Sequence, residues 1–456
     1  TLDFSPDPGY EVPARLRGEG ARGRGLLFDQ QGRVKADQAG FAVIPVETLD
    51  DGSTRFRVGI FYNRPFPESG FAVGDRIAVW MRAGRNYLPE VCGRIVSENI
   101  NLWASGFVAV CGNVGAGPLV FRNVRIEPRP GTNRLLGGNA DGFNVRGMGK
   151  GPILENCVVD SIGDDAVNFQ GVYYRVFEVR SPTELVTQSF PRYGDEPPVL
   201  RFMTADASHR ALGAVRMAGA TAMPYQLPDD WKPLGWRANR GFEPGQKTQA
   251  FLVTLQRPLP TTDAQIIFSS EGALCAGAEI RDCVFRNLFS RGIRLQSSHA
   301  LIENNRIERT TGAGLTFAGH PSFWGEADNA HHVQVRGNTF VENAIADQRW
   351  GRSAIVLETP GDKTAADLIS DIDIVGNTIR APGGSAVYLN GCRNVTISQN
   401  KIQGWGRLPF RPRDGTQKPV AYGSPILNEN ATGLTVRANR LDTPGPHGQP
   451  EPMITF

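Results

Sequence analysis

The sequence predicts an all-β protein: a right-handed parallel β-helix with two inserted small β-barrel domains. The chain has 456 residues, of which 53 are glycine, and few stretches have helical periodicity. A six-residue phrase with alternating apolar positions recurs eight times from residue 121 onward. Repeats of about 20–50 residues indicate a solenoid, in which each coil stacks on the one before it.

The first repeated phrase contains an asparagine in most coils. The phrase reads FRNVRI at 121, LENCVV at 154, IRDCVF at 280, IENNRI at 302, VRGNTF at 335, IVGNTI at 374, ISQNKI at 397 and VRANRL at 436. Its fourth place is Asn305, Asn338, Asn377, Asn400 and Asn439 in the last five coils. The leucine-rich repeat has a similar period, but its L-x-x-L-x-L phrase is missing. We therefore expect stacked asparagines that hydrogen-bond the coils above and below.

A second phrase follows the first and aligns as one strand in successive coils. It reads DGFNVR at 141, DAVNFQ at 165, RGIRLQ at 291, AGLTFA at 313, SAIVLE at 353, SAVYLN at 385 and SPILNE at 424. The third and fifth places are mostly apolar and are expected to point into the core. The fourth and sixth places are mostly polar, which predicts a wet, hydrogen-bonding outer face of the kind that binds sugars.

Two stretches without these phrases interrupt the repeat. Residues 172–270 contain short strand-like runs separated by Pro- and Gly-rich loops, which predicts a β-barrel inserted between coils. Residues 30–92, with FAVIPVET, TRFRVGIF and GDRIAVWM, predict a similar barrel. We assign the remaining stretches to the β-helix, with a partial first coil at 1–29 and further coils at 93–171 and 271–456.

Composition excludes several functional classes. The formal net charge of +3 is too small to indicate nucleic-acid binding or attraction to a membrane surface. The sequence has no run of 18 apolar residues, so we expect no transmembrane helix. The N-terminal residues do not resemble a signal peptide, which fits either a mature secreted or periplasmic chain or a chain that lacks its first segment. The six cysteines form no CxxC pair, which favours buried free thiols over zinc or disulfides. No cofactor is indicated, and a solenoid with side domains is compatible with a homodimer.

Three aspartates mark the candidate catalytic site. Asp141 lies in N-A-D-G, and Asp164 and Asp165 lie in G-D-D-A. Asp141 and Asp165 align in one column, and stacked strands lie ~4.8 Å apart. With Arg291 or Arg294 as the only nearby cations, repulsion should raise the pKa of at least one carboxyl. The alternative is ordinary turn chemistry, since Asp beside Gly is common in turns.

Such a cluster suits the hydrolysis of glycosides. That reaction needs a protonated acid for the leaving oxygen and a carboxylate that activates water or attacks the sugar. Two carboxylates that share one water favour the inverting route. Calcium, which also binds clustered carboxylates, is the alternative. We predict no metal, because the outer face offers few further oxygen ligands at regular spacing.

Seven further residues are candidates for substrate binding. They are Asn139, Asn168, Gln170, Arg294, Gln296, Trp324 and Glu358. Asn139 either orients Asp141 or caps the turn, and the polar residues of the two strands are either sugar contacts or a solvated ladder. Trp324 lies in GHPSFWGEADNAHH (319–332), which is either a pocket wall or a plain surface insert. Glu358 lies three coils beyond Asp165 and needs a curved pocket to take part.

Two families of β-helix enzymes share these motifs. N-A-D-G followed by G-D-D-A resembles the N-T-D and D-D motifs of the polygalacturonases, which have the pectin-lyase-like fold. Those enzymes also carry G-H-G and R-I-K, whereas this chain reads SRGIRLQSS, with Arg294 alone in common. The chain is more similar to glycoside hydrolase family 110, the bacterial α-1,3-galactosidases. The similarity covers about residues 98–171, through ENINLWASGFVAVCGN, FRNVRI, NADGFNVRGMGKGPILENC and SIGDDAVNFQG.

The second resemblance implies an inverting exo-enzyme that releases terminal galactose from α-1,3-linked glycans, of the blood group B type or linear. It implies that Asp141, Asp164 and Asp165 are catalytic. The polygalacturonase analogy suggests Asp164 as general acid, with Asp141 and Asp165 as the base pair. The alternatives are a polygalacturonase-like or α-glucanase-like hydrolase, which uronate cleavage would indicate, and a non-catalytic carbohydrate-binding solenoid, whose glycan binding would survive loss of the aspartates.

Overall fold

We analysed a computed structural model of the chain. It describes residues 2–4, 23–35, 41–48, 50, 54–59, 72–80, 87–190, 197–206, 209–232, 242–260, 265–317, 324–327, 330–346, 353–359, 368–408 and 423–454. Among these residues, no helix has the length and apolar character needed to cross a membrane.

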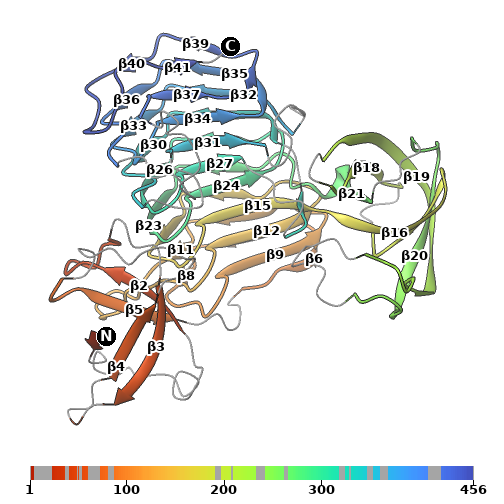
Figure 1. The fold of residues 1–456 in the computed structure, drawn as a ribbon, viewed down its shortest axis with the longest axis horizontal. Coiled ribbons are helices and arrows are strands. Elements are labelled where there is room, and N and C mark those ends of the chain that lie inside the picture. The colour runs from red at the N-terminus through yellow and green to blue at the C-terminus, as the bar shows by residue number, and fades with distance from the viewer. Residues whose placement is uncertain are drawn as a thin grey trace.

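Three parallel sheets wrap around one core to form a right-handed β-helix, which rises from β6 to β39 in Figure 1. Each coil contributes one strand to each sheet. Sheet 1 consists of β7 (Ile95–Glu98), β10 (Leu119–Arg122), β13 (Ile153–Glu155), β22 (Glu279–Arg281), β25 (Leu301–Glu303), β29 (Ala330–Arg336), β32 (Ile369–Val375), β35 (Cys392–Ser398), β38 (Ala431–Thr432) and β39 (Thr435–Arg437). The predicted all-β class and parallel β-helix are confirmed.

The other two sheets complete each coil. Sheet 2 consists of β8 (Asn101–Leu102), β11 (Arg125–Ile126), β14 (Val158–Asp160), β23 (Val284–Leu288), β26 (Arg306–Thr310), β30 (Thr339–Val341), β33 (Thr378–Arg380), β36 (Lys401–Gln403) and β40 (Arg440–Leu441). Sheet 3 consists of β6 (Glu90–Cys92), β9 (Val110–Gly115), β12 (Phe143–Met148), β15 (Val167–Val172), β24 (Ile293–Gln296), β27 (Leu315–Phe317), β31 (Ile355–Glu358), β34 (Val387–Asn390), β37 (Ile426–Asn428) and β41 (Met453–Ile454), with β28 (Glu326–Ala327) antiparallel to β15.

The expected asparagine stack is present where sheet 1 turns into sheet 2. Asn338 is fully buried, and its Oδ1 accepts bonds from the backbone N–H and the Nδ2 of Asn305 at 2.9 and 3.0 Å. The same pattern continues through Asn377, Asn400 and Asn439. Each amide therefore satisfies backbone groups that a turn in the core would otherwise leave without partners.

The second repeated phrase also stacks in the predicted register. Phe143 pairs with Val167, Val167 with Ile293, and Ile293 with Leu315. The third and fifth places are buried in one continuous apolar core. Parallel in-register stacking brings equivalent side chains together, which is why a repeat in the sequence translates directly into spatial columns.

The N-terminal residues differ from the prediction. β1 (Leu2–Phe4), β2 (Gly23–Phe28), β3 (Phe41–Thr48), β4 (Thr54–Gly59) and β5 (Arg76–Trp80) form one antiparallel sheet in the order β1-β4-β3-β2-β5. The described residues of β1 and β2 therefore do not belong to the partial coil predicted at 1–29, because an apolar strand pattern does not specify which sheet the strand joins. Among the described residues, the predicted barrel at 30–92 is an open sheet that includes β1 and β2, while β6 pairs with β9 of the β-helix.

This N-terminal sheet packs against the β-helix beside the aspartates. Phe28 of β2 contacts Phe289 with ring centroids 5.1 Å apart, in a cluster with Leu26, Val34 and Ile345. The contact holds the sheet against the turn that precedes β24.

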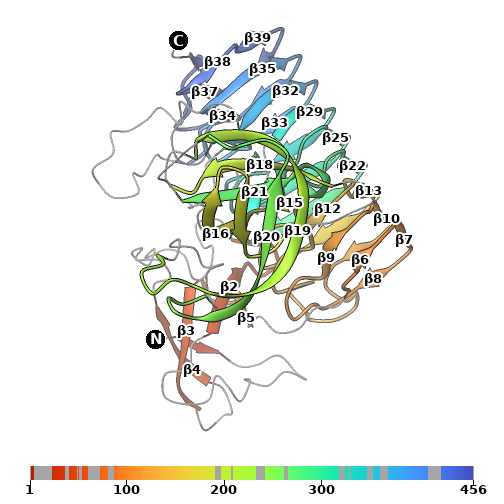
Figure 2. The ribbon, with the colours of Figure 1, turned by 90° about the vertical axis from the view of Figure 1, so that its right-hand side faces the viewer.

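A closed barrel interrupts the β-helix after β15. Its six strands are β16 (Tyr174–Ser181), β17 (Glu184–Thr187), β18 (Val199–Thr204), β19 (Ala211–Gln226), β20 (Lys247–Leu255) and β21 (Ile266–Ser270), followed by the short 3₁₀ helix η3 (Glu271–Ala273). Figures 1 and 2 show it standing to one side of the coils. It has its own apolar core, which includes Leu200, Val253 and Phe268.

The cysteines are free thiols wherever the structure describes their side chains. Cys111, Cys157, Cys275, Cys283 and Cys392 are all buried and unbridged. Cys157 and Cys283 occupy the asparagine column in two earlier coils, where the backbone N–H of Cys157 lies 3.3 Å from the Cys283 sulfur. Burial raises the pKa of Cys392 to about 12, so this thiol is protected from reaction.

Candidate active site

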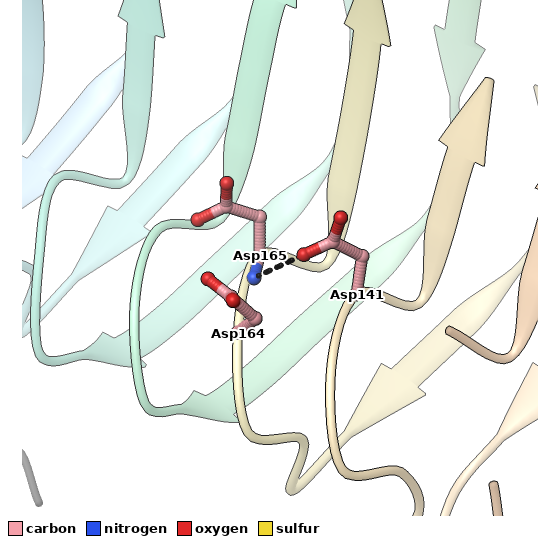
Figure 3. A group of neighbouring side chains, drawn as sticks. All are labelled: Asp141, Asp164 and Asp165. Carbon is pink, nitrogen blue, oxygen red and sulfur yellow. Dashed lines mark hydrogen bonds between the residues drawn. The ribbon is translucent and has the colours of Figure 1, made fainter. Parts of the chain in front are cut away.

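The three aspartates come together where two neighbouring coils enter sheet 3 (Figure 3). Asp141 precedes β12, and Asp164 and Asp165 precede β15. One carboxylate oxygen of each lies within 4.8 Å of the other two. Asp165 is 1% and Asp141 8% exposed, while Asp164 is the most accessible of the three. The predicted clustering is confirmed, and its catalytic role stays a prediction.

Backbone stacking sets this arrangement. The N–H of Gly142 donates to the carbonyl of Asp165, and the N–H of Ala166 donates to the carbonyl of Arg291. The residue after Asp141 must be glycine, since a Cβ on Gly142 would lie 2.6 Å from the carbonyl oxygen of Ala166. The glycine of N-A-D-G thus allows close packing between the coils beside Asp141.

Asp141 is held by two donors. The side-chain amide of Asn144 donates to its Oδ2 at 2.6 Å, and the backbone N–H of Asp165 donates to its Oδ1 at 3.3 Å (dashed in Figure 3). Both contacts orient the carboxylate and suit its ionised form, because an ionised carboxylate only accepts hydrogen bonds.

Asp165 is paired with a buried cation. The backbone N–H and the Nε of Arg291 donate to its Oδ1 at 3.0 and 2.8 Å, and the Nη2 donates to its Oδ2 at 2.7 Å. The two side chains are 2% and 7% exposed. Burial alone would raise the pKa of Asp165, but the charge and hydrogen bonds of Arg291 outweigh it and hold the pKa below its ordinary value. The expected effect of like-charge repulsion is therefore reversed at Asp165.

The polar face beside the aspartates is buried, contrary to expectation. Asn168, Gln170, Arg294 and Gln296 are 4%, 3%, 3% and 0% exposed. The short strand β28 pairs with the end of β15 and places Glu326 in an ion pair with Arg294. Burial lowers the pKa of Arg294 despite the attraction of Glu326. An inserted strand thus covers a face that the repeat alone predicted to be wet.

The remaining candidates are dispersed. The backbone N–H of Asn139 donates to the carbonyl of Ser105, in the turn that leads to Asp141. Glu358, at the end of β31, is half-buried in the predicted column three coils beyond Gln170. Both positions agree with the predicted register, and neither establishes a contact with substrate.

Trp324 does not join the aspartates. It is 39% exposed and precedes Gly325, whose carbonyl accepts a bond from the N–H of Tyr173, beyond the end of β15. At ~3.3 Å per residue, that is roughly 25 Å along the chain from Asp165. The prediction that Trp324 walls the sugar site is therefore not supported. Residues 319–323 and 328–329 of the same insert lie outside the described residues.

Two neighbours of the aspartates were not predicted as site residues. Arg291 occupies the column of Asp141 and Asp165 one coil further on. The sequence could have indicated it, because R-G at 291 stands where the two earlier coils have D-G and D-A. Phe107 lies one coil before Ala140 and two before Asp164, because the pairings on both sides of this turn have the same stagger. Phe107 is partly exposed and packs on a small apolar cluster that contains Ala140.

The cluster also has a spacing that a cation could use. Arg291 already takes three hydrogen-bond positions on Asp165, however. A carboxylate has about four such positions in total. Asp165 is therefore largely committed to Arg291, which leaves it little capacity to bind a metal ion.

Known proteins provide independent evidence of relationship. A family model described as a right-handed β-helix region matches residues 265–402. α-1,3-Galactosidase B of Bacteroides thetaiotaomicron is 24% identical over 356 residues, or 76% of this chain and 52% of that protein. α-1,3-Galactosidase A of Akkermansia muciniphila is 22% identical over 69% of this chain and 50% of that protein. α-1,3-Galactosidase A of Peterkaempfera griseoplana is 24% identical over 91% of this chain and 54% of that protein.

The chain is similar over most of its length to proteins named α-1,3-galactosidase. It spans about half the length of these curated relatives. Solved structures similar to it include the A-module of a mannuronan C-5 epimerase of Azotobacter vinelandii, at 13% identity and a TM-score of 0.33, covering 77% of this chain and 59% of that one. Another is an α-1,3-glucanase of Streptomyces thermodiastaticus, at 12% identity and a TM-score of 0.27, covering 76% of this chain and 50% of that one.

Proposed function

We propose that the protein is an exo-acting, inverting α-1,3-galactosidase that releases terminal galactose from blood group B-type or linear α-1,3-linked glycans. The observation that carries the proposal is the cluster of three carboxylates, each in a different environment. The relationship to proteins named α-1,3-galactosidase supports the substrate class. Such glycans are found outside the cytoplasm, so we also propose a secreted or periplasmic location.

The environments of the carboxylates support a division of roles. Asp164 is the most accessible of the three carboxyls, so it protonates the leaving oxygen. Asp141 is oriented by Asn144 and accepts a proton from the attacking water. Asp165, ionised against Arg291, lies beside Asp141 and helps to orient that water. Acid and base are thus separated by environment, as glycoside hydrolysis requires.

The short spacing between the carboxylates, taken alone, fits a retaining mechanism for the same activity. In many glycosidases the two carboxyls of a retaining pair lie ~5 Å apart, whereas inverting pairs lie about 6.5–9.5 Å apart. The closest oxygens here lie within 4.8 Å. We favour inversion because the site has three carboxylates, so a water can lie between two of them while the third donates the proton.

The first released anomer distinguishes these mechanisms. Proton NMR of the purified protein acting on galactose-α-1,3-galactose is expected to show β-galactose before mutarotation produces the α form. Early α-galactose would keep the substrate and overturn inversion. Cleavage of galacturonans instead would indicate a polygalacturonase-like enzyme. Binding without release from any glycan would indicate a carbohydrate-binding solenoid.

Phe107 is proposed as an apolar platform for the sugar. It is partly exposed on the same turn column as Asp164, with the small residue Ala140 between them. Replacement of Phe107 by Ala is expected to raise KM about tenfold and change kcat less, because a lost stacking contact of about 1–1.5 kcal/mol weakens binding. Steady-state kinetics check this, with Trp324→Ala, at the far end of β15, as the matched control. Equal effects from both variants would contradict the platform.

A further inference from the structure

We propose that Arg291 is a positioning residue that keeps Asp165 ionised and so leaves the transferable proton to Asp164. The inference rests on the proposed function, because it concerns how that site divides its proton. Arg291 would act through Asp165 and need not contact the sugar.

The geometry of the pair carries this proposal. Arg291 grips both oxygens of Asp165 through Nε and Nη2 and adds its own backbone N–H. This two-pronged contact fixes the plane of the carboxylate as well as its charge. The two residues lie in one column of adjacent coils, so the main chain already places them face to face.

A purely structural ion pair would not need this position. Exposed pairs contribute little to stability, and a buried pair often stabilises no more than apolar residues of the same volume. This pair is buried within hydrogen-bond reach of the carboxylate cluster, where an unpaired acid would compete for the catalytic proton. Its position therefore suggests a role in assigning protons rather than in holding the coils together.

The other charges around Asp165 do not replace Arg291. The charged groups that face this pair are Asp141, Asp164, Arg294 and Glu326. Arg294 forms its ion pair with Glu326, whereas Arg291 forms its ion pair with Asp165. Loss of Arg291 would leave Asp165 beside Asp141 and Asp164, while the nearby Arg294 would still be paired with Glu326.

The test compares Arg291→Gln and Arg291→Lys with the wild type in the pH profile of kcat/KM on galactose-α-1,3-galactose. Removal of an adjacent cation raises a carboxyl pKa by about 1–3 units. The acid limb of the Arg291→Gln profile should therefore move to higher pH by about that amount, with kcat lowered at least about 100-fold. The acid limb of the Arg291→Lys profile should move less, since lysine keeps the positive charge but cannot make the two-pronged contact of the guanidinium.

Arg286→Gln is the matched control. Arg286 bonds Asp160 at 2.7 Å and bridges the same two coils away from the aspartates. Its loss should leave the acid limb in place. An unmoved limb in both Arg291 variants, with stability lost as in Arg286→Gln, would overturn the proposal and give Arg291 a structural role only. If Arg291→Gln does not fold, Arg291→Lys against Arg286→Lys provides the same comparison.

A second readout does not depend on turnover. The pKa of Asp165 is lowered in the folded protein, so the pair contributes stability above the unfolded-state value of about 3.9, and this stability is lost as pH falls through the folded-state pKa. The unfolding midpoint of wild type should fall more steeply below about pH 4 than that of Arg291→Gln. Equal slopes would overturn the assignment of charge to Asp165, whereas a wild type inactive on every α-1,3-galactoside would overturn the proposed function instead.

Discussion

Replacement of Asp164 by Asn is expected to lower kcat on galactose-α-1,3-galactose by about 10³- to 10⁴-fold, with KM changed little. General acid catalysis contributes an effect of about this size when the leaving group is a poor one, as a sugar alkoxide is. Asp164 is the most accessible of the three carboxyls. It is therefore the group best placed to reach the glycosidic oxygen and to give up a proton.

The assignment predicts a selective rescue. α-Galactosyl fluoride releases fluoride, which needs no protonation, so Asp164→Asn should hydrolyse it at a rate within about tenfold of wild type. Asp141→Asn is the matched control, because it removes an adjacent carboxylate that activates water rather than the leaving group. Its activity should stay low on both substrates. Measurement of the two variants on the two substrates separates acid from base.

Two outcomes would contradict this division. If Asp141→Asn were rescued by the fluoride and Asp164→Asn were not, the roles would be exchanged. If neither variant lost activity on the disaccharide, the cluster would not be the catalytic centre. Circular dichroism shows whether both variants are folded like the wild type, and Asn preserves the shape of each side chain.

Much of this site could be predicted because the fold is a stack of equivalent coils. The repeated phrases specify which residues share a column, so the adjacency of Asp141 and Asp165 followed from alignment of D-G-F with D-A-V. The same logic correctly predicted the buried asparagines, since each fourth place must serve the backbone of its neighbours. In-register parallel stacking turns a local pattern into a long-range contact.

What the repeat could not predict arises from segments that do not repeat. Strand β28 has only two residues and pairs with the end of β15, yet its Glu326 makes Arg294, which was expected to point outward, part of a buried ion pair. The strands β1 and β2 have apolar patterns that suit either a coil or a sheet, and only tertiary pairing decides between them. The grip of Arg291 on Asp165 depends on side-chain conformation, which the column alone does not specify.

Replacement of Asn338 by Leu is expected to lower the free energy of unfolding of the β-helix by about 3–5 kcal/mol. The side chain is fully buried and accepts from the backbone N–H of Asn305 while donating to the carbonyl of Ile302 at 2.9 Å. It also donates to the side chain of Asn377. Each buried backbone group left without a partner costs about 1–3 kcal/mol, so two such groups and a broken amide chain give the expected loss.

The position along the stack provides the control. Asn439 makes the same two kinds of backbone contact, with Asn400 and Ile397, but it is half-buried and no further asparagine follows it. Water can reach the groups exposed by Asn439→Leu, so its loss should be about 1–2 kcal/mol.

Chemical denaturation measures the total stability, and hydrogen exchange locates the defect. In Asn338→Leu the amide of Asn305 should exchange much faster than in wild type, because its acceptor is gone. In Asn439→Leu the faster amide should be that of Asn400. Galactose release by both variants should persist below their unfolding transitions, since the aspartates lie several coils away. Equal losses of stability would contradict this prediction, because the access of water to the groups around Asn439 would then make no difference.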